Sequence, residues 1–386
     1  MPKHVLHIIT RMILGGAQEN TLISCEGLAR SDEWDVTLLT GPALGPEGEL
    51  LQRARDKGIR TIVLPHLRRE PSPWHDFQAF RQILGYILSL QPDIVHTHSS
   101  KAGILGRFAA CFARTPVVLH TIHGLPFHPY QSWWENKLYV LLEKAAARCS
   151  DGIVCVADAM RSQALNAGVG SPEQYQVIYS GMDVEPYRLG ENVRCALRRR
   201  LGFSSSDIVV TKIARLFELK GHRYVLEAAP GVIEACPSVK FLFVGDGVLR
   251  EELEEKTKAL GLEDHVVFAG LYPPSGIPEV IAATDLLVHA SLREGLPRVA
   301  VQALLGGKPV VCFDVDGTTE VVIDGETGRA VPPGSVEGLR NAIIELARNP
   351  SQARKMGREG QKKVREQFKS QKMVEKLKEL YRTLDF

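Results

Sequence analysis

The sequence of 386 residues carries no strong charge of either sign. It holds 47 lysine and arginine residues against 45 aspartate and glutamate residues, which leaves a formal net charge of only +2. Proteins that bind nucleic acid usually show a clear basic excess or a basic face. We therefore expect no nucleic-acid partner, and we interpret the basic run from Arg194 to Arg200 as a solvated helix face.

Long apolar runs and paired cysteines are also missing. No stretch approaches the roughly 18 consecutive apolar residues of a transmembrane helix, and the opening "MPKHVLHIITRMILGGAQEN" lacks the features of a signal peptide. The seven cysteines form no Cys-x-x-Cys pair, which favours reduced thiols over disulfides or zinc ligands. We expect a cytoplasmic protein that is either soluble or peripheral on the inner face of the membrane.

What the sequence does have is an alternation of short apolar runs and helical patterns. Runs such as "HVLHIIT", "WDVTLLT" and "DIVHTH" occupy the first half, and "DIVVTKIA", "VKFLFVG" and "DLLVHAS" follow after Arg200. Buried strands that alternate with amphipathic helices indicate parallel sheets covered on both faces. The fold class is therefore α/β, with two doubly wound domains.

The length of the chain and its polar segment "GMDVEPYRLGENVRCALRRRLGFSSSD" indicate two domains. A chain this long exceeds what one hydrophobic core usually serves. We expect an N-terminal domain over 1–183, a hinge over 184–206 and a C-terminal domain over 207–365. A helix over 366–386 keeps an apolar stripe, so we expect it to pack back on the N-terminal domain.

Ligands of open parallel sheets bind outside the carboxyl ends of the strands, so strand-to-helix turns hold the candidate site residues. In "TRMILGGAQENTL", Gly15 and Gly16 follow the first strand and open a helix. Backbone N–H groups at such a helix start can bind an anion. The full G-x-G-x-x-G spacing is absent, so a turn that merely needs glycine remains an equal alternative.

Histidines mark two further turns of the first half. His98 ends one strand, ahead of Ser99 and Lys101, and His123 ends the next, with Gly124 allowing close approach of a ligand. We expect His96 and His120 to be core residues. His96 and His98 would share one strand face without further ligands, so we expect no metal site.

Two turns of the second half carry charged residues. In "IARLFELKGH", Arg215 and Lys220 place two cations five residues apart, which suits a diphosphate, although solvated surface charges are the alternative. In "REGLPRVAVQAL", Glu294 precedes a helix that we expect to start at Pro297. The carboxylate could stabilise the helix N-terminus or accept hydrogen bonds from a polyol.

Taken in order, these motifs resemble the retaining, nucleotide-sugar-dependent glycosyltransferases of the GT-B fold, family 4. The resemblance spans essentially the whole chain and includes "DIVHTHSSKAGILGR", "IYSGMD", "VGDGVLREELE", "FAGL", "EGLPRVAVQAL" and "GGKPVV". It implies two Rossmann-like domains that face each other across a crevice. The acceptor would lie on the N-terminal side and the donor on the C-terminal side.

The resemblance also implies roles for individual residues. Arg215 and Lys220 would bind the donor diphosphate, Glu294 the transferred sugar, and His123 would polarise groups beside that sugar; these four form the expected catalytic set. The other expected donor-binding residues are Gly15, Gly16, Gly245, Phe268, Leu271, Gly295, Leu296 and Gln302. His98, Ser99 and Lys101 are the expected acceptor residues.

Gln302 departs from the commonest family pattern, which has a second glutamate there to bind the ribose hydroxyls. An amide can still accept from one hydroxyl and donate to another, but a charge-assisted bond of about 1.5–3 kcal/mol becomes a neutral bond near ~1 kcal/mol. We expect weaker donor binding or a different donor preference rather than lost activity.

The expected function is metal-independent, retaining transfer of a sugar from a nucleotide diphosphate, UDP rather than GDP, to a hydroxyl acceptor in glycan, glycolipid or polysaccharide synthesis. No cofactor is expected, and Asp314 and Asp316 are interpreted as a turn rather than a metal site. Two alternatives stay open, a non-catalytic nucleotide-sugar-binding subunit and a nucleotide-sugar 2-epimerase. Trp133 and Trp134 lie in a helix that could face a membrane with a lipid-linked acceptor or pack against the sheet.

Overall fold

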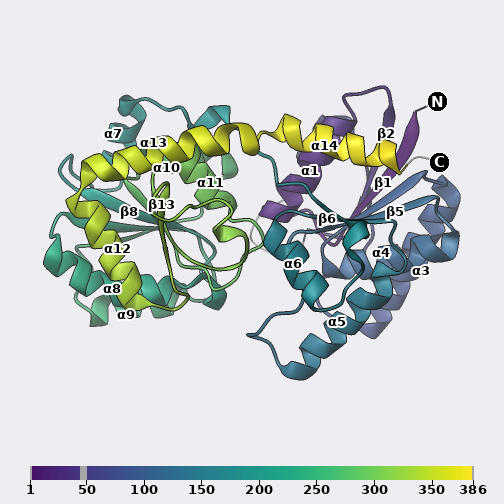
Figure 1. Cartoon of the computed structure of the whole chain (residues 1–386), viewed down its shortest axis with the longest axis horizontal. Helices are drawn as coiled ribbons and strands as arrows, with labels where there is room; N and C mark the ends of the chain where they lie inside the picture. Colours follow the sequence, from purple (N-terminus) through teal and green to yellow (C-terminus); the bar gives the residue numbers. More distant parts are fainter. Residues whose placement is uncertain (1, 44–49, 385–386) are drawn as a thin grey trace. The chain divides into compact units, whose positions relative to one another are not determined.

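The chain forms two compact units in a computed structural model that describes residues 2–43 and 50–384. The first unit runs to Met182 and takes up the chain again from Lys369, and the second unit is Asp183–Phe368. The last helix, α14 (Ser370–Thr383), therefore belongs to the first unit, while α13 (Pro350–Gln367) belongs to the second. Figure 1 shows the helices around each sheet.

Unit 1 is built on a parallel sheet of seven strands in the order β3-β2-β1-β4-β5-β6-β7. Its strands are β1 (Lys3–Ile9), β2 (Trp34–Thr40), β3 (Arg60–Val63), β4 (Ile94–His98), β5 (Val117–Ile122), β6 (Gly152–Cys155) and β7 (Tyr175–Val177). Its other helices are α1 (Gly16–Leu28), α2 (Leu51–Asp56), α3 (Pro73–Leu90), α4 (Ser100–Ala113), α5 (Trp133–Ala147) and α6 (Asp158–Asn166). The strand order reverses between β1 and β4, which is where doubly wound sheets bind ligands.

The alternation of side chains along β1 divides the residues of unit 1 between two faces. Leu6 and Ile8 pack in one apolar cluster with α3 and α4. Val5 and Ile9 pack in another, with α1 and with Met373, Val374, Leu377 and Tyr381 of α14. The apolar stripe predicted for the C-terminal helix is thus buried against this sheet.

Unit 2 repeats the architecture on a parallel sheet in the order β10-β9-β8-β11-β12-β13. Its strands are β8 (Ile208–Ile213), β9 (Val239–Val244), β10 (Val266–Gly270), β11 (Leu286–His289), β12 (Val310–Phe313) and β13 (Gly328–Val331). Its remaining helices are α7 (Glu191–Arg200), α8 (His222–Ala235), α9 (Arg250–Ala259), α10 (Ile277–Ala283), α11 (Arg298–Leu305) and α12 (Val336–Arg348). The order reverses between β8 and β11.

The prediction of two doubly wound α/β domains is confirmed. The sequence reasoning missed β13, a four-residue edge strand of the second sheet that reads GRAV and so lacks a continuous apolar run. Cys25, Cys155, Cys236 and Cys312 are buried as free thiols. Within the described residues, no helix combines the length and the apolar character needed to cross a membrane.

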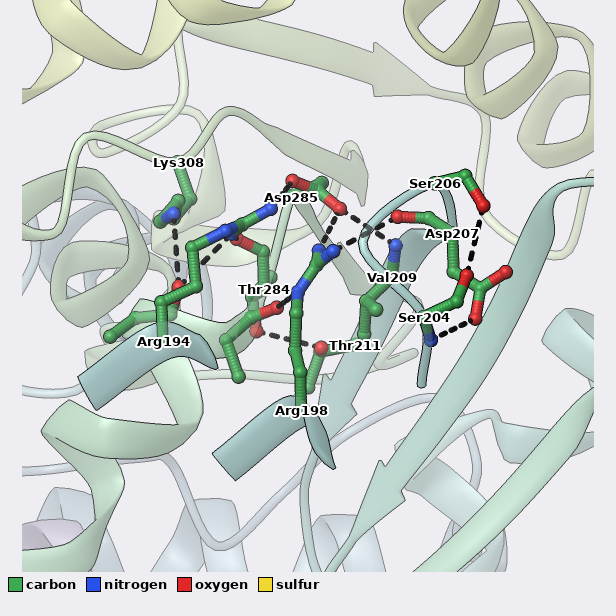
Figure 2. A network of polar contacts seen from close by, with 12 residues as sticks. Arg194, Arg198, Ser204, Ser206, Asp207, Val209, Thr211, Thr284, Asp285 and Lys308 are labelled. Carbon is green, nitrogen blue, oxygen red and sulfur yellow. Dashed lines mark hydrogen bonds and ion pairs between the residues drawn. The ribbon is translucent and has the colours of Figure 1, made fainter. Parts of the chain in front are cut away.

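Helix α7 lies in the segment predicted as a hinge, and within unit 2 its arginines pair with Asp285, directly before β11 (Figure 2). Arg194 Nη2 lies 2.6 Å from Asp285 Oδ1, and Arg198 pairs with the other oxygen of the same carboxylate. Arg198 is buried and Arg194 is half-buried, so the prediction of a solvated basic face is wrong for these two residues. A cavity of about 470 Å³ beside Arg194 and Lys308 opens at the amino ends of the strands, away from the carboxyl-end loops.

Candidate active site

The carboxyl ends of β8 and β11, which pair directly with each other, bring two predicted site residues into contact. Lys220 lies at the end of a short 3₁₀ helix (Glu218–Lys220) after β8, and Glu294 lies in the loop after β11. Lys220 Nζ is 2.6 Å from Glu294 Oε1. The switch point of the unit 2 sheet therefore carries an ion pair whose members are 74 positions apart.

Two more residues hold Glu294. Its backbone N–H donates to Asp316 Oδ2 at 2.7 Å, from the loop after β12. His289 Nε2 lies 3.1 Å from Glu294 Oε1. Burial alone would raise the pKa of Glu294, but the nearby Lys220 and His289 outweigh it and hold that pKa well below its usual value. Glu294 is thus a half-buried carboxylate that stays ionised.

Near this pair lies a buried lysine that sequence reasoning missed. Lys212, in β8, is fully buried, and its Nζ has no hydrogen-bond partner in the described structure. Burial, and then the charge of Lys220, lowers the pKa of Lys212 to about 7. His222, at the start of α8, is also buried, and its two ring nitrogens find no partner among the described residues. The carboxyl edge of this sheet is therefore rich in cationic and donor groups.

The other predicted donor residues of unit 2 lie in β10, in α11 and in the loops that follow the strands. Arg215 follows β8, and its guanidinium stacks 4.9 Å from the ring of Phe217. Gly245 follows β9 with φ of +139°, and a Cβ there would lie 2.0 Å from Ala214 O, so only glycine fits. Their ligand contacts stay predictions.

The remaining donor residues differ in exposure. Phe268, in β10, packs edge-on against Phe243 at 5.3 Å, whereas Leu271 just beyond the strand is exposed. Leu296 is buried, and Gln302 is half-buried on the second turn of α11. That helix begins at Arg298 with Pro297 as its cap, one residue later than predicted. The ribose contact of Gln302 stays a prediction.

In unit 1, the neighbouring strands β1, β4 and β5 lead to predicted donor, acceptor and catalytic residues, respectively. The glycine turn, with Gly15 and Gly16, opens α1 after β1. Ser99, which follows β4, has φ of +62°, and its Oγ lies 2.7 Å from Thr10 Oγ1 beyond β1. This contact ties the loop after β4 to the loop after β1.

The histidines of the same edge form a direct contact. His98 Nδ1 lies 3.1 Å from His123 Nε2. His98 is buried, and burial lowers its pKa well below the usual value, whereas His123 is half-buried and lines a small pocket with Ser99 and Gly124. Two residues that the sequence predicted for the site, His98 and His123, are thus in contact.

Lys101 behaves differently from its predicted partners. Its Nζ lies 2.6 Å from Asp76 Oδ1 of α3, so its charge is neutralised within unit 1. His96 and His120 are buried, as predicted for core residues. His96 bonds Thr121 Oγ1 and His120 bonds Thr97 Oγ1.

The structure adds His7 to the two histidines of β4. Nitrogen atoms of His7, His96 and His98 all lie within 4.8 Å of one another. The sequence reasoning rejected a metal at His96 and His98 because it saw no further ligand, and His7 removes that ground. Position 7 gave no signal because it lies in the middle of an ordinary apolar strand pattern.

Two family models match the chain at these same units. Residues 15–181 match the "Glycosyl transferase 4-like domain", and residues 193–363 match "Glycosyl transferases group 1". The chain belongs to the group 1, family 4 glycosyltransferases of the GT-B fold, and the resemblance seen in the sequence is confirmed.

Individual relatives span nearly the whole chain. The UDP-Gal:alpha-D-GlcNAc-diphosphoundecaprenol alpha-1,3-galactosyltransferase of Escherichia coli is 28% identical over 380 residues, 98% of this chain and 96% of the relative. The capsular polysaccharide biosynthesis glycosyltransferase CapM of Staphylococcus aureus is 22% identical and shares 83% of this chain and 84% of its own length. The protein is accordingly a glycosyltransferase.

Solved structures agree on the fold. Anabaena Alr3699/HepE in complex with UDP and glucose aligns with a TM-score of 0.84 at 23% identity, covering 99% of this chain and 100% of that one. WaaG, a glycosyltransferase involved in lipopolysaccharide biosynthesis, aligns with a TM-score of 0.77 at 16% identity, covering 98% and 99%. At these identities the match supports the GT-B fold.

Proposed function

We propose that this glycosyltransferase is a retaining, metal-independent enzyme that uses a UDP-sugar and acts in polysaccharide or glycolipid synthesis. The observation that carries the proposal is the Lys220–Glu294 pair at the switch point of unit 2. An ionised carboxylate beside cations can accept hydrogen bonds from sugar hydroxyls, and the cations can bind a diphosphate. One site can thus bind both the sugar and the diphosphate of a nucleotide sugar.

Support for UDP comes from the relatives. The E. coli galactosyltransferase is named for UDP-Gal, and HepE was solved with UDP and glucose. In this chain, Phe268 and Leu271 would hold the base and Gln302 the ribose. The glycine turn at Gly15 and Gly16 would donate backbone N–H groups to the donor.

The proposed chemistry depends on charge at the leaving group. The bond from the anomeric carbon to the phosphate oxygen breaks, the acceptor oxygen bonds to that carbon on the same face, and the hydroxyl proton passes to the departing phosphate oxygen. Negative charge that develops on the diphosphate is stabilised by Arg215 and Lys220. These two cations would do the work that a divalent metal does in other transferases.

The acceptor is proposed to be a lipid-linked sugar at a membrane surface. The E. coli relative is named for an undecaprenol-linked acceptor. In this chain, α5 exposes the large apolar side chains of Trp133, Trp134, Leu138 and Leu141, and Lys137 lies 4.8 Å over the ring of Trp133. Exposed tryptophan and leucine beside lysine are typical of a helix that lies on a bilayer.

A nucleotide screen tests the donor proposal. UDP should raise the melting temperature more than GDP or ADP does, because a ligand that binds only the folded state stabilises it by mass action. The increase should be lost in Arg215→Ala and kept in Arg223→Ala, a matched arginine that pairs with Glu218 at the surface of the same loop region. Stabilisation by GDP alone, or by no nucleotide, contradicts the proposal.

A further inference from the structure

The loop that carries Glu294 connects β11 to α11 and contains no helix or strand from residue 290 to residue 297. Neighbouring loops hold it through its backbone. The N–H of Leu292 donates to Leu219 O at 2.9 Å, in the loop that also carries Lys220. The N–H of Glu294 donates to Asp316 Oδ2 at 2.7 Å. The first bond joins backbone to backbone, whereas the second depends on the side chain of Asp316.

Asp316 has an unusual backbone conformation, with φ of +47°. Among the residues that the structure describes, the other non-glycine residues with positive φ are Gln91, Ser99 and Arg114. Gln91 and Arg114 end helices, where this conformation is common. Asp316 instead begins a short 3₁₀ helix (Asp316–Thr318) that follows β12. Side chains adopt this conformation at a cost in free energy, and such residues cluster at functional sites.

The position of Asp316 follows from the sheet. β11 and β12 pair in parallel, so the loops after them lie at the same edge. A carboxylate that accepts from a backbone N–H forms a charge-assisted bond, which is stronger than a neutral one. Burial lowers the pKa of Arg293, and the charges of Asp316 and Glu294 partly offset this lowering. Asp316 therefore acts on two consecutive residues of the neighbouring loop.

The carboxylate of Glu294 uses one oxygen for the protein. Lys220 Nζ lies 2.6 Å from Oε1, and His289 Nε2 lies 3.1 Å from the same atom. Oε2 forms no hydrogen bond or ion pair with the described residues. An ionised carboxylate oxygen is an acceptor, which suits the hydroxyl of a sugar. The N–H and Oε1 of Glu294 are thus both held, and Oε2 is left for a ligand.

We propose that Asp316 is a positioning residue that fixes the backbone at Glu294, so that Glu294 Oε2 contacts a hydroxyl of the transferred sugar in the orientation needed for transfer. The inference rests on the proposed function, in which Glu294 binds that sugar. It assigns Asp316 a role beyond the predicted turn. A displacement of about 1 Å in such a contact can lower a rate by roughly 10²-fold, so the role concerns the rate of transfer rather than the affinity for the nucleotide.

Three substitutions of Asp316 separate the acceptor oxygen from the backbone conformation. Asp316→Asn keeps an acceptor oxygen in a residue type that tolerates positive φ. Asp316→Gly accommodates positive φ without strain but has no acceptor, and Asp316→Ala lacks both properties. The control is Asp314→Ala. Asp314 directly follows β12, is exposed and forms no side-chain hydrogen bond or ion pair with the described residues.

Hydrogen exchange tests the contact without any transfer reaction. It is measured by NMR at the assigned Glu294 amide of the full chain. This amide should exchange slowly in the wild type, in Asp316→Asn and in Asp314→Ala. It should exchange about 10-fold faster or more in Asp316→Gly and Asp316→Ala, because the bond that protects it is lost. Exchange at the wild-type rate in Asp316→Gly would overturn the inference.

Hydrolysis of a UDP-sugar, with water as the acceptor, tests the consequence of the contact. Asp316→Gly should lower kcat by about 10–100-fold and leave the affinity for UDP within about threefold. Asp316→Asn should keep kcat within about threefold, because a neutral hydrogen bond replaces the charge-assisted one. In a protein that already carries Glu294→Gln, Asp316→Gly should lower kcat by less than about threefold more, since it acts through that carboxylate.

The outcomes distinguish the inference from the proposed function. Hydrolysis at the wild-type rate by Asp316→Gly, where Glu294→Gln is impaired, would overturn the inference alone. Effects of the two substitutions that multiply in the double variant would do the same, because Asp316 would then act independently of Glu294. Hydrolysis at the wild-type rate by Glu294→Gln would contradict the proposed function, and the positioning role would fail with it.

Discussion

Lys220 and Glu294 form a 2.6 Å ion pair across the two central strands at which the second sheet reverses its order. Each residue follows its own strand by a few positions, so the pair exists only because β8 and β11 are neighbours. Open α/β sheets bind their ligands at this point. The pair therefore lies at the position where this fold is expected to bind the donor.

Removing the charge of Glu294 should separate nucleotide binding from transfer. Glu294→Gln keeps the shape of the side chain but weakens its hydrogen bonds to sugar hydroxyls, so we expect kcat/KM to fall about 10²–10³-fold, as when one strong stabilising group is lost. The affinity for UDP, measured by calorimetry, should change less than threefold (~0.6 kcal/mol).

The control is Glu326→Gln, which removes a carboxylate paired with Lys363 at 2.6 Å in a more exposed setting. This control variant should leave kcat/KM and the affinity for UDP unchanged. Transfer by Glu294→Gln at the wild-type rate would show that Glu294 does not act in the transfer.

Gln302→Glu should tighten donor binding. A carboxylate at this position could form charge-assisted bonds to the ribose, so the Kd for UDP should fall by about 3–10-fold. Gln302→Leu, which lacks polar atoms, should raise that Kd. Equal affinities in all three proteins would place Gln302 away from the ribose.

Lys212→Met should stabilise the fold. Replacing a buried, unpaired lysine by an apolar side chain of similar length should raise the free energy of unfolding by about 1–4 kcal/mol at pH 7. Lys240→Met changes a half-buried lysine of β9 that donates to Asp264 O, and it should give no such gain.

Lys212→Met should also alter the pH dependence of the free energy of unfolding. The folded pKa of Lys212 is about 7, below its usual 10.5, so the unfolded chain binds more protons between these values. Stability contributed by this group therefore rises with pH across that window. Urea unfolding at pH 7 and pH 9 should show a smaller rise in Lys212→Met than in the wild type. An unchanged rise would mean that the pKa of Lys212 is not lowered in the folded protein.

Trp133 and Trp134 should carry the membrane affinity of α5. The double variant to alanine should lower co-sedimentation with phosphatidylglycerol vesicles by about 10-fold or more, since burying one large apolar side chain is worth about 1.5–3 kcal/mol. Trp74→Ala removes an exposed tryptophan from α3 and should have no effect. Equal losses in both variants would argue against a role for α5.

The site was predictable where a residue stands at a strand end. His98 ends a buried strand, whereas Lys220, Glu294 and His123 follow buried strands. Each parallel sheet gathers such positions at one edge. The partners inside the sheet were not predictable. His7 contacts His98 across 91 positions, and Tyr381 contacts His96 across 285. Predicting these contacts requires the register of the strands and the position of α14 on the sheet.

Lys212 and the arginines of α7 were missed for a related reason. A lysine within a strand pattern and a basic run on a helix look like surface features until the neighbouring elements are in place. Burial of Lys212 depends on the elements that cover β8, and the burial of Arg198 depends on Asp285 at the start of β11.

The most direct test of the proposed function is proton NMR of a UDP-α-sugar hydrolysed by the enzyme in the presence of EDTA. Water replaces the unknown acceptor, and the anomeric signal of the first sugar released reports the stereochemistry before mutarotation. We expect the α-anomer to appear first, at a rate unaffected by EDTA and lost in Glu294→Gln. Initial release of the β-anomer, or hydrolysis that stops on chelation, would contradict a retaining, metal-independent transferase.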